Sequence, residues 1–330
     1  MKGRWVELDI RDSIVLYTVN KALKTGLSIK RIIEWIGVSR TKFYQWKGRL
    51  GIENSHNGKI PKDHWLLPWE REAIIEYAKR HRSEYLFHSR DGYRRLTYMM
   101  LDEDVVAVSS STVYRVLKIS GLLNQWNTKS TSVKGKGYKH PREPHQEWHT
   151  DIKYVNFRGT YLFFIGVMDG YSRYLVHHEL RRNMTEYDIE ITIQRALEKY
   201  PDKNPRIISD NGSQYISKDF QSFLKEAGLQ HIRTSVAYPQ SNGKLERFHR
   251  SINSECLRNH SLIDLEDARK QIAMYVNYYN TKRLHSSLYY LTPEDFLLGW
   301  VNGKLKKRQK KLNDALKNRK NYWNKLKKIA

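Results

Sequence analysis

Three acidic residues, Asp151, Asp210 and Glu246, stand where catalytic carboxylates would be useful. Asp151 lies inside an apolar and aromatic run, Asp210 directly follows the short apolar run 206–209, and Glu246 begins a predicted helix. A buried carboxylate is costly unless it is paired or bound to a metal ion. Carboxylates without accompanying thiolates or an ordered set of imidazoles favour a hard cation, so the three residues predict Mg²⁺ ligands, with Mn²⁺ as a possible substitute.

Two such ions would suit phosphodiester chemistry. Held roughly 3.5–4 Å apart, one ion activates the attacking oxygen while the other stabilises the leaving oxygen. Any single carboxylate could instead be a helix cap or a surface charge, and we accept that interpretation for Asp169 and Asp202. The set of three predicts a catalytic site with two Mg²⁺ ions.

The elements that must position these carboxylates form an alternating series. We expect strands at 148–155, 161–168, 173–180, 206–209 and 230–234, and helices at 184–199, 217–227 and from Gly243 onward. The order β-β-β-α-β-α-β-α predicts an α/β core, a mixed five-stranded sheet covered by helices. Asp210 would then lie at the carboxyl end of the fourth strand, where α/β sheets usually place their sites.

The distribution of charge indicates a polyanionic partner. The formal net charge is +24, of which residues 1–150 carry +11, residues 151–300 only +2, and the last thirty residues +11. A nearly neutral middle between two basic ends fits an enzyme core held on nucleic acid by its neighbours. A ribosome-associated or merely well-solvated basic protein would show the same sum.

Residues 1–50 have the pattern of a helix-turn-helix DNA-binding domain. Isoleucines at helical spacing over 28–36 precede the turn 37–39 and a basic second helix over 40–47. The early residues of such a second helix meet base edges, so the predicted DNA contacts are Arg40, Thr41, Lys42 and Gln45. A small helical bundle is the alternative interpretation.

A weaker second helix-turn-helix candidate covers 66–124. Helices are expected from Glu70, from Gly92 and over 109–118, and the predicted DNA contacts are Arg94, Arg95 and Arg115. Polar linkers are predicted at 51–65 and, with basic character, at 125–146. They leave 147–299 as the catalytic core and 300–330 as a basic tail, which is either a helix on DNA, a helix on another subunit, or disordered.

The composition argues against several kinds of site and segment. Cys256 is the only cysteine, so an internal disulfide and a cysteine-based zinc site are excluded. No apolar run is long enough to span a membrane, so no membrane partner is expected. No signal peptide is expected either. This composition suits a reducing cytosol.

Four blocks in order resemble those of the retroviral-integrase superfamily, whose catalytic residues form a DDE triad. The last resembles bacterial insertion-sequence transposases in particular, and 35 residues separate Asp210 from Glu246, the spacing of that superfamily. The blocks are 148–151 (WHTD), 209–215 (SDNGSQY), 238–246 (YPQSNGKLE) and 278–294, which contains YYN, RLHSSL and LTPE.

The resemblance implies an RNase H-like core preceded by all-α helix-turn-helix modules, with the acidic triad as metal ligands. It implies hydrolytic nicking at element ends and attack of the freed 3′-OH on another phosphodiester, without a covalent intermediate or a nucleotide cofactor. The implied partners are double-stranded DNA, as terminal inverted repeats and target, and further copies of the chain, at least a dimer. The implied location is the bacterial cytoplasm, at the nucleoid.

The same blocks suggest further contacts with DNA. The candidates beside the catalytic residues are Asn211, Gln214, Tyr215, Gln240, Asn242, Lys244 and Arg247. Related transposases often carry Lys or Arg seven positions after the catalytic Glu, where this chain has Asn253. Arg250, at i+4 from Glu246, lies near the same helical face and is the substitute candidate.

Two other functions stay open on the sequence. An RNase H-like nuclease would cut DNA without joining it, and would not need two DNA-reading modules. A domesticated DNA-binding regulator would carry an idle catalytic domain, although a relic could lose any of the three carboxylates freely. Products of strand transfer would distinguish the transposase from both alternatives.

Overall fold

The computed structural model describes residues 6–52, 62–84, 91–123, 140–233 and 243–329. The chain divides into two compact units, residues 1–65 with 320–330, and residues 66–319. Each unit is described by itself below.

The first unit contains the predicted helix-turn-helix. Helix α1 (Leu8–Thr25) precedes α2 (Ile29–Ile36) and α3 (Arg40–Lys47). Gly37 ends α2 in a left-handed conformation, with φ of 73°, which a side chain would disfavour. Ser39 caps α3 by accepting a hydrogen bond from the Lys42 amide. The turn is therefore built by the residues from which it was predicted, and the N-terminal region is helical.

Three helices form the start of the second unit. They are α4 (Pro68–Glu84), α5 (Tyr93–Asp102) and α6 (Ser110–Ile119). Their apolar faces meet in one cluster in which Leu96, Val113 and Leu117 are buried and Tyr93 is partly buried. Ser109 caps α6 through the amide of Thr112.

A mixed five-stranded sheet follows, as predicted. Its strands are β1 (Glu147–Phe157), β2 (Thr160–Asp169), β3 (Leu175–Arg181), β4 (Arg206–Ser209) and β5 (His231–Arg233), in the order β3-β2-β1-β4-β5. The first three pair antiparallel, while β4 runs parallel to β1 and β5 runs parallel to β4. The predicted fifth strand reached Thr234, which lies outside the described residues.

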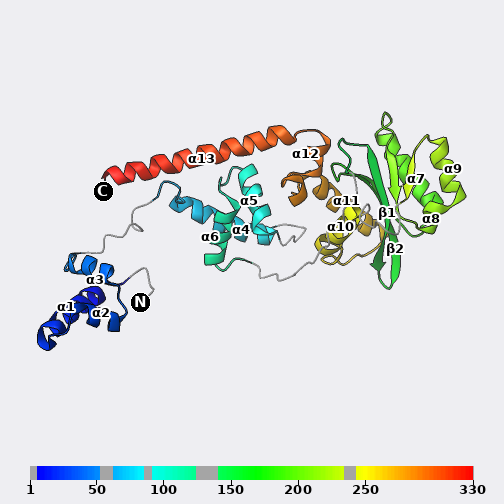
Figure 1. Ribbon diagram of the computed structural model, residues 1–330. Coiled ribbons are helices and arrows are strands. Elements are labelled where there is room, and N and C mark those ends of the chain that lie inside the picture. Colours follow the sequence, from blue (N-terminus) through cyan, green and yellow to red (C-terminus); the bar gives the residue numbers. More distant parts are fainter. Residues whose placement is uncertain (1–5, 53–61, 85–90, 124–139, 234–242, 330) are drawn as a thin grey trace. The chain divides into compact units, whose positions relative to one another are not determined.

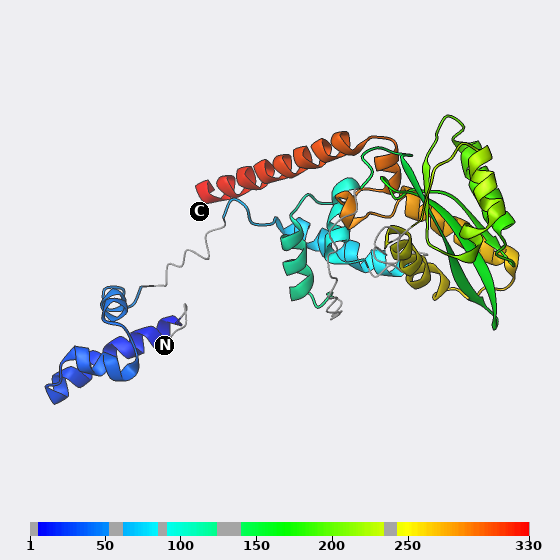
Figure 2. The same ribbon diagram turned by 45° about the vertical axis from the view of Figure 1, so that its right-hand side comes forward.

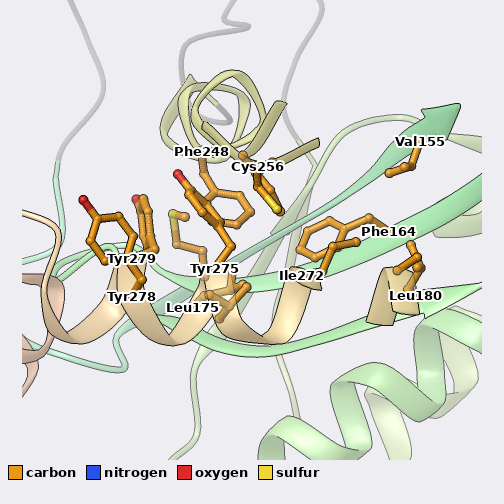
Figure 3. Close-up of a cluster of buried hydrophobic side chains, with 14 of the residues drawn as sticks. Val155, Phe164, Leu175, Leu180, Phe248, Cys256, Ile272, Tyr275, Tyr278 and Tyr279 are labelled. Carbon is orange, nitrogen blue, oxygen red and sulfur yellow. The ribbon is translucent and has the colours of Figure 1, made fainter. Parts of the chain in front are cut away.

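Helices cover both faces of the sheet (Figure 1). On one face, α7 (Glu186–Lys199), α8 (Ser213–Ile216) and α9 (Lys218–Glu226) bury an apolar cluster that includes Trp148 and Ile165. On the other, α10 (Gly243–Ile252), a short π-helix η2 (Asn253–Leu257) and α11 (Leu265–Thr281) bury a second cluster that includes Phe164. In Figure 3, aromatic side chains of α10 and α11 lie over the strands. Side chains alternate along β1, so the two clusters take alternate residues.

The last elements are η3 (Ser286–Leu288), α12 (Pro293–Leu297) and the long helix α13 (Val301–Ile329), drawn in orange to red in Figure 2. Within the second unit, the buried Arg308 donates hydrogen bonds to the Asp102 carboxylate and to the carbonyls of Tyr289 and Tyr290. Arg319 is also buried and paired with Glu70. The domain boundaries proposed from the sequence stay predictions. Part of the positive charge of the tail is paired with carboxylates of the same chain.

No helix in the described ranges has both the length and the apolar character that a membrane crossing requires.

Candidate active site

The three acidic residues come from three elements beside one another. Asp151 lies within β1, and Asp210 directly follows β4. The parallel register sets His149 opposite Ile208, so Asp151 and Asp210, each two residues further on, lie at neighbouring positions. Glu246 lies in the first turn of α10, the helix that covers the Asp151 face of β1.

His249 links α10 to this position. It lies one turn after Glu246, and its Nδ1 is 3.5 Å from Oδ2 of Asp151. Burial lowers the pKa of His249 to about 3, so the ring is neutral and does not compensate the carboxylate. Sequence reasoning missed this residue, although its i+3 spacing from Glu246 placed it near the same face of the helix.

Asp151 lies in an environment that disfavours its charge. Its side chain is 17% exposed, and burial raises its pKa to about 7. The nearby negative charge of Asp210, and to a smaller extent that of Glu246, act in the same direction, while the Ile152 amide opposes them. Neither Asp210 nor Glu246 forms an ion pair with any described residue. The site therefore holds mutually repelling carboxylates whose charge is partly offset by Lys153 at a distance but by no direct ion pair with a described lysine or arginine.

The donor set fits a hard divalent cation, because all three ligands would be carboxylate oxygens whose repulsion such an ion relieves. Among the residues that the structure describes, no three acidic, histidine or cysteine side chains are already grouped closely enough to hold a metal ion. The three carboxylates are thus within electrostatic range of one another but not gathered into a ligand cage.

The segment after Asp210 holds its carboxylate in place. Oδ1 of Asp210 accepts a hydrogen bond of 2.9 Å from the Gly212 amide. A Cβ at Gly212 would come within 3.1 Å of that same oxygen and 3.4 Å of Oε1 of Gln214. Asn211 is exposed and Gln214 half-buried, so both are available near the site.

Tyr215 does not lie where the sequence suggested. It is 1% exposed, packs in the core beneath the sheet, and its hydroxyl is 3.2 Å from Oγ1 of Thr150. Burial raises its pKa. The helical turn of α8 directs the side chain inward, so Tyr215 supports β1 rather than presenting its ring to DNA.

The basic candidates on α10 differ in exposure. Lys244 is half-buried, and its Nζ donates a hydrogen bond to the carbonyl of Gly170. Burial, and then the charge of Arg173, lower the pKa of Lys244 to about 8. Arg247 and Arg250 are exposed. The other two candidates of this block, Gln240 and Asn242, lie outside the described residues.

The predicted DNA contacts in the two helical modules also differ in their surroundings. In α3, Arg40, Thr41 and Gln45 are exposed, whereas Nζ of Lys42 lies 4.9 Å from the centre of the Trp46 ring. In the second module Arg94 and Arg115 are exposed.

Arg95 differs from its neighbours because it forms an ion pair with the fully buried Asp91. This pairing gives Arg95 a structural role, and a contact with DNA would compete with it.

Gly170, which follows β2, should not tolerate a larger residue. A Cβ there would lie 2.8 Å from Nε2 of the buried His149 and 3.2 Å from the Glu147 carbonyl. We expect Gly170→Ala to lower the free energy of unfolding by about 1–3 kcal/mol, since overpacking forces neighbours apart. Denaturant unfolding measures the effect. Gly303→Ala, whose Cβ would meet nothing within 4 Å, is the control and should cause no loss; equal stabilities of the two variants would contradict the expectation.

Comparison with known families agrees with this architecture. Residues 141–239 and residues 227–293 match two family models, each described as an integrase core domain. The matched part of the chain, residues 141–293, is thus similar to integrase core domains, and the similar proteins are insertion-sequence transposases. This match agrees with the resemblance carried by the four sequence blocks, and the mixed five-stranded sheet with helices is the predicted core.

The curated relatives are transposases of bacterial elements. The transposase for insertion sequence element IS904 of Lactococcus lactis subsp. lactis is 25% identical over 244 residues, covering 69% of this chain and 94% of the relative. The putative transposase InsK for element IS150 of Escherichia coli is 24% identical, covering 63% of this chain and 77% of the relative. The integrase core match and these relatives support a polynucleotidyl transferase activity.

Among solved structures, the HTLV-2 integrase catalytic core domain in complex with magnesium, in its dimeric form, is 18% identical with a TM-score of 0.38. It covers 47% of this chain and 97% of that one. A simian T-cell lymphotropic virus intasome chain is 15% identical with a TM-score of 0.44, covering 67% of this chain and 74% of that one.

Proposed function

We propose that this transposase nicks the ends of its element and transfers the freed 3′-OH to target DNA at one site formed by Asp151, Asp210 and Glu246. The observation that carries the proposal is the position of three carboxylates from β1, the end of β4 and α10 near one another, where burial and then the charges of Asp210 and Glu246 raise the pKa of Asp151 to about 7. Structural carboxylates are normally paired with a base, whereas among the described residues no lysine or arginine forms an ion pair with any of these three.

The triad residues would hold two Mg²⁺ ions, or Mn²⁺ in their place. When bound, these ions supply activation of the attacking oxygen and stabilisation of the leaving oxygen. The chain's own residues position the carboxylates: the Gly212 amide holds Asp210, and the neutral His249 faces Asp151. Because the carboxylates are not yet gathered, binding of a shared ion requires them to move together.

We propose that the helix-turn-helix of the first unit binds the terminal inverted repeats. Arg40, Thr41 and Gln45 are exposed on α3, as direct contact with base edges requires. The second module would add phosphate contacts through Arg94 and Arg115. Two element ends must be joined in one reaction, so at least two copies of the chain act together on double-stranded DNA. The proposed location, the nucleoid of a bacterial cytoplasm, follows from that partner.

A strand-transfer assay tests the proposed function. Purified protein, Mg²⁺ and a labelled duplex carrying the ends that flank its gene should give joined products. Asp210→Asn and Glu246→Gln should each reduce them at least about 10³-fold, because the ions lose a ligand whose charge holds the reacting phosphate. Asp202→Asn, at an exposed carboxylate, is the matched control and should retain activity.

The other outcomes separate the alternatives. Metal-dependent nicking without joining would replace the proposal by an RNase H-like nuclease. Tight binding without chemistry in Mg²⁺ or Mn²⁺ would favour a DNA-binding regulator. Joining that persists in Asp210→Asn would remove the triad assignment.

A further inference from the structure

The turn between β2 and β3 carries an arginine, Arg173, whose side chain forms no hydrogen bond or ion pair with a described residue. Arg173 has a left-handed backbone, with φ of 64°, an uncommon conformation for a residue other than glycine. The turn is fixed by Asp169, whose Oδ2 accepts hydrogen bonds from the amide and the hydroxyl of Ser172. The Arg173 amide donates to the Asp169 carbonyl at 2.9 Å. The turn therefore holds Arg173 in one place.

The side chain of Arg173 is half-buried, yet no described residue accepts a hydrogen bond from its guanidinium or forms an ion pair with it. The acidic residue of the turn itself and the one on the strand beside Gly170 have other partners. Both carboxylate oxygens of Asp169 accept hydrogen bonds from the chain, and Glu147 pairs with Arg206. Burial lowers the pKa of Arg173, as it does for a cation without a counter-ion.

The segments that the structure does not describe in this unit cannot supply the missing carboxylate. Residues 85–90, 124–139 and 234–242 contain neither Asp nor Glu. The counter-ion for Arg173 must therefore come from an acidic residue already described or from outside this unit. The described acidic residues do not contact it.

Two further cations lie beside Arg173. Lys244 of α10 donates its hydrogen bond to Gly170, in the same turn. Arg247, one helical turn later, is exposed and close enough for its charge to disfavour that of Arg173. Three cations from two elements thus lie near one another, and the two carboxylates whose charges act on Lys244, those of Glu147 and Asp169, have other partners. A multiply hydrogen-bonding anion is the ligand that such a group accommodates.

We propose that Arg173, Lys244 and Arg247 form a phosphate subsite that holds the DNA backbone beside the reacting phosphate. The proposal rests on the proposed function and adds a residue, Arg173, and a location to it. Helix α10 connects this subsite to Glu246, so the bound phosphate neighbours the one at the carboxylates. Arginine suits this position because its planar fork binds phosphate oxygens in pairs.

Salt-dependent binding of a labelled duplex by the full chain tests the subsite. Ca²⁺ replaces Mg²⁺ so that DNA is bound without reaction. Arg173→Gln should weaken binding about 10-fold, and should flatten the slope of log K against log salt by about 1, the value for one lost phosphate contact. Arg182→Gln, at an exposed arginine beyond the other end of β3, is the matched control and should behave as wild type. Arg173→Lys, which keeps the charge, should restore the slope but only part of the affinity.

Thermal unfolding of the DNA-free variants separates binding from a structural role. Removal of an uncompensated buried cation should leave the Tm of Arg173→Gln equal to or above that of wild type. Inorganic phosphate, compared with chloride at equal ionic strength, should raise the Tm of wild type and not that of Arg173→Gln. A lowered Tm with an unchanged salt slope, or equal slopes for Arg173→Gln and Arg182→Gln, would overturn the subsite.

Strand transfer by the wild-type protein on the same duplex keeps the two proposals distinguishable. If Arg173→Gln shows the predicted slope change relative to wild type but wild type never joins DNA, the proposed function fails and the phosphate subsite stands. If wild type joins DNA and Arg173→Gln joins it with equal affinity and slope, the subsite fails alone.

Discussion

Asp151→Asn should abolish strand cleavage and, in the same protein, stabilise the metal-free fold above pH 7. Activity is lost because an amide cannot replace the charged ligand, and we expect a decrease of at least about 10³-fold. Stability is gained because the wild-type carboxylate is ionised at pH 8 in a buried site beside Asp210 and Glu246. Asp151 would thus lower the stability of the metal-free protein although its activity requires this residue.

The sign of the pH dependence follows from the raised pKa. The folded value is about 7, above the ordinary 3.8 of the unfolded chain, so the folded state holds the proton more tightly. Below the pKa of the unfolded chain, Asp151 is protonated in both states and does not lower the free energy of unfolding. As pH rises, its ionisation lowers that free energy, and the loss is complete above about pH 7. One pKa unit corresponds to about 1.4 kcal/mol, so the stabilisation at pH 8 reaches up to about 4 kcal/mol.

Thermal and denaturant unfolding at pH 8 and pH 4, with and without Mg²⁺, measure both effects. The Asn variant should be the more stable at pH 8, with the difference shrinking towards pH 4. Mg²⁺ should raise the Tm of wild type and not of the variant, since ligands stabilise the state that binds them. Asp202→Asn should show neither change. A variant that is less stable than wild type at pH 8 would refute the electrostatic account of the site.

Arg283→Met should be among the most destabilising single changes in the second unit. Arg283 donates hydrogen bonds of 2.7 and 2.6 Å to the two carboxylate oxygens of Glu255, and the Tyr275 hydroxyl donates to the same carboxylate. The paired side chains are only 9% and 13% exposed. Removal of one partner leaves a buried charge, which costs about 3–5 kcal/mol.

Loss of Arg283 should also impair catalysis indirectly. Glu255 belongs to η2, which directly follows α10 and therefore Glu246. Denaturant unfolding, with hydrogen exchange of β1, α10 and α11, measures stability, and strand transfer measures activity.

The double variant Arg283→Met with Glu255→Met is the control, because removing both charges should recover most of the loss. Losses that simply add would contradict the pairing.

Much of the core was predictable because its signals are local. All five strands were predicted from the local sequence, the second of them from a continuous apolar run, and β4 has the predicted bounds. The placement of Asp151 within a strand, Asp210 after one and Glu246 in a first helical turn follows from the same patterns. Their roles as metal ligands and the DNA contacts stay predictions.

Features that depend on long-range pairing could not be predicted in this way. His249 approaches Asp151 only because α10 covers β1. Arg173 lacks Asp169 as an ion-pair partner because the Asp169 carboxylate accepts hydrogen bonds within the turn. Tyr215 stands within a DNA-facing block, but the short helix α8 turns it into the core. Local spacing specifies which elements form, whereas the partner of each polar side chain depends on how the elements meet.

The buried pairs of α13 change what the formal charge of this protein means. Arg308 and Arg319 neutralise Asp102 and Glu70 inside the fold, and Lys311 lies against Asp104. Counterions are released from DNA only by cations that reach its phosphates. The salt dependence of binding should accordingly reflect the exposed lysines of the helix, such as Lys306, Lys310 and Lys317, and not the full basic count of the tail. The basic residues of this helix that pair with carboxylates of the protein itself stabilise the fold and do not contribute to DNA binding.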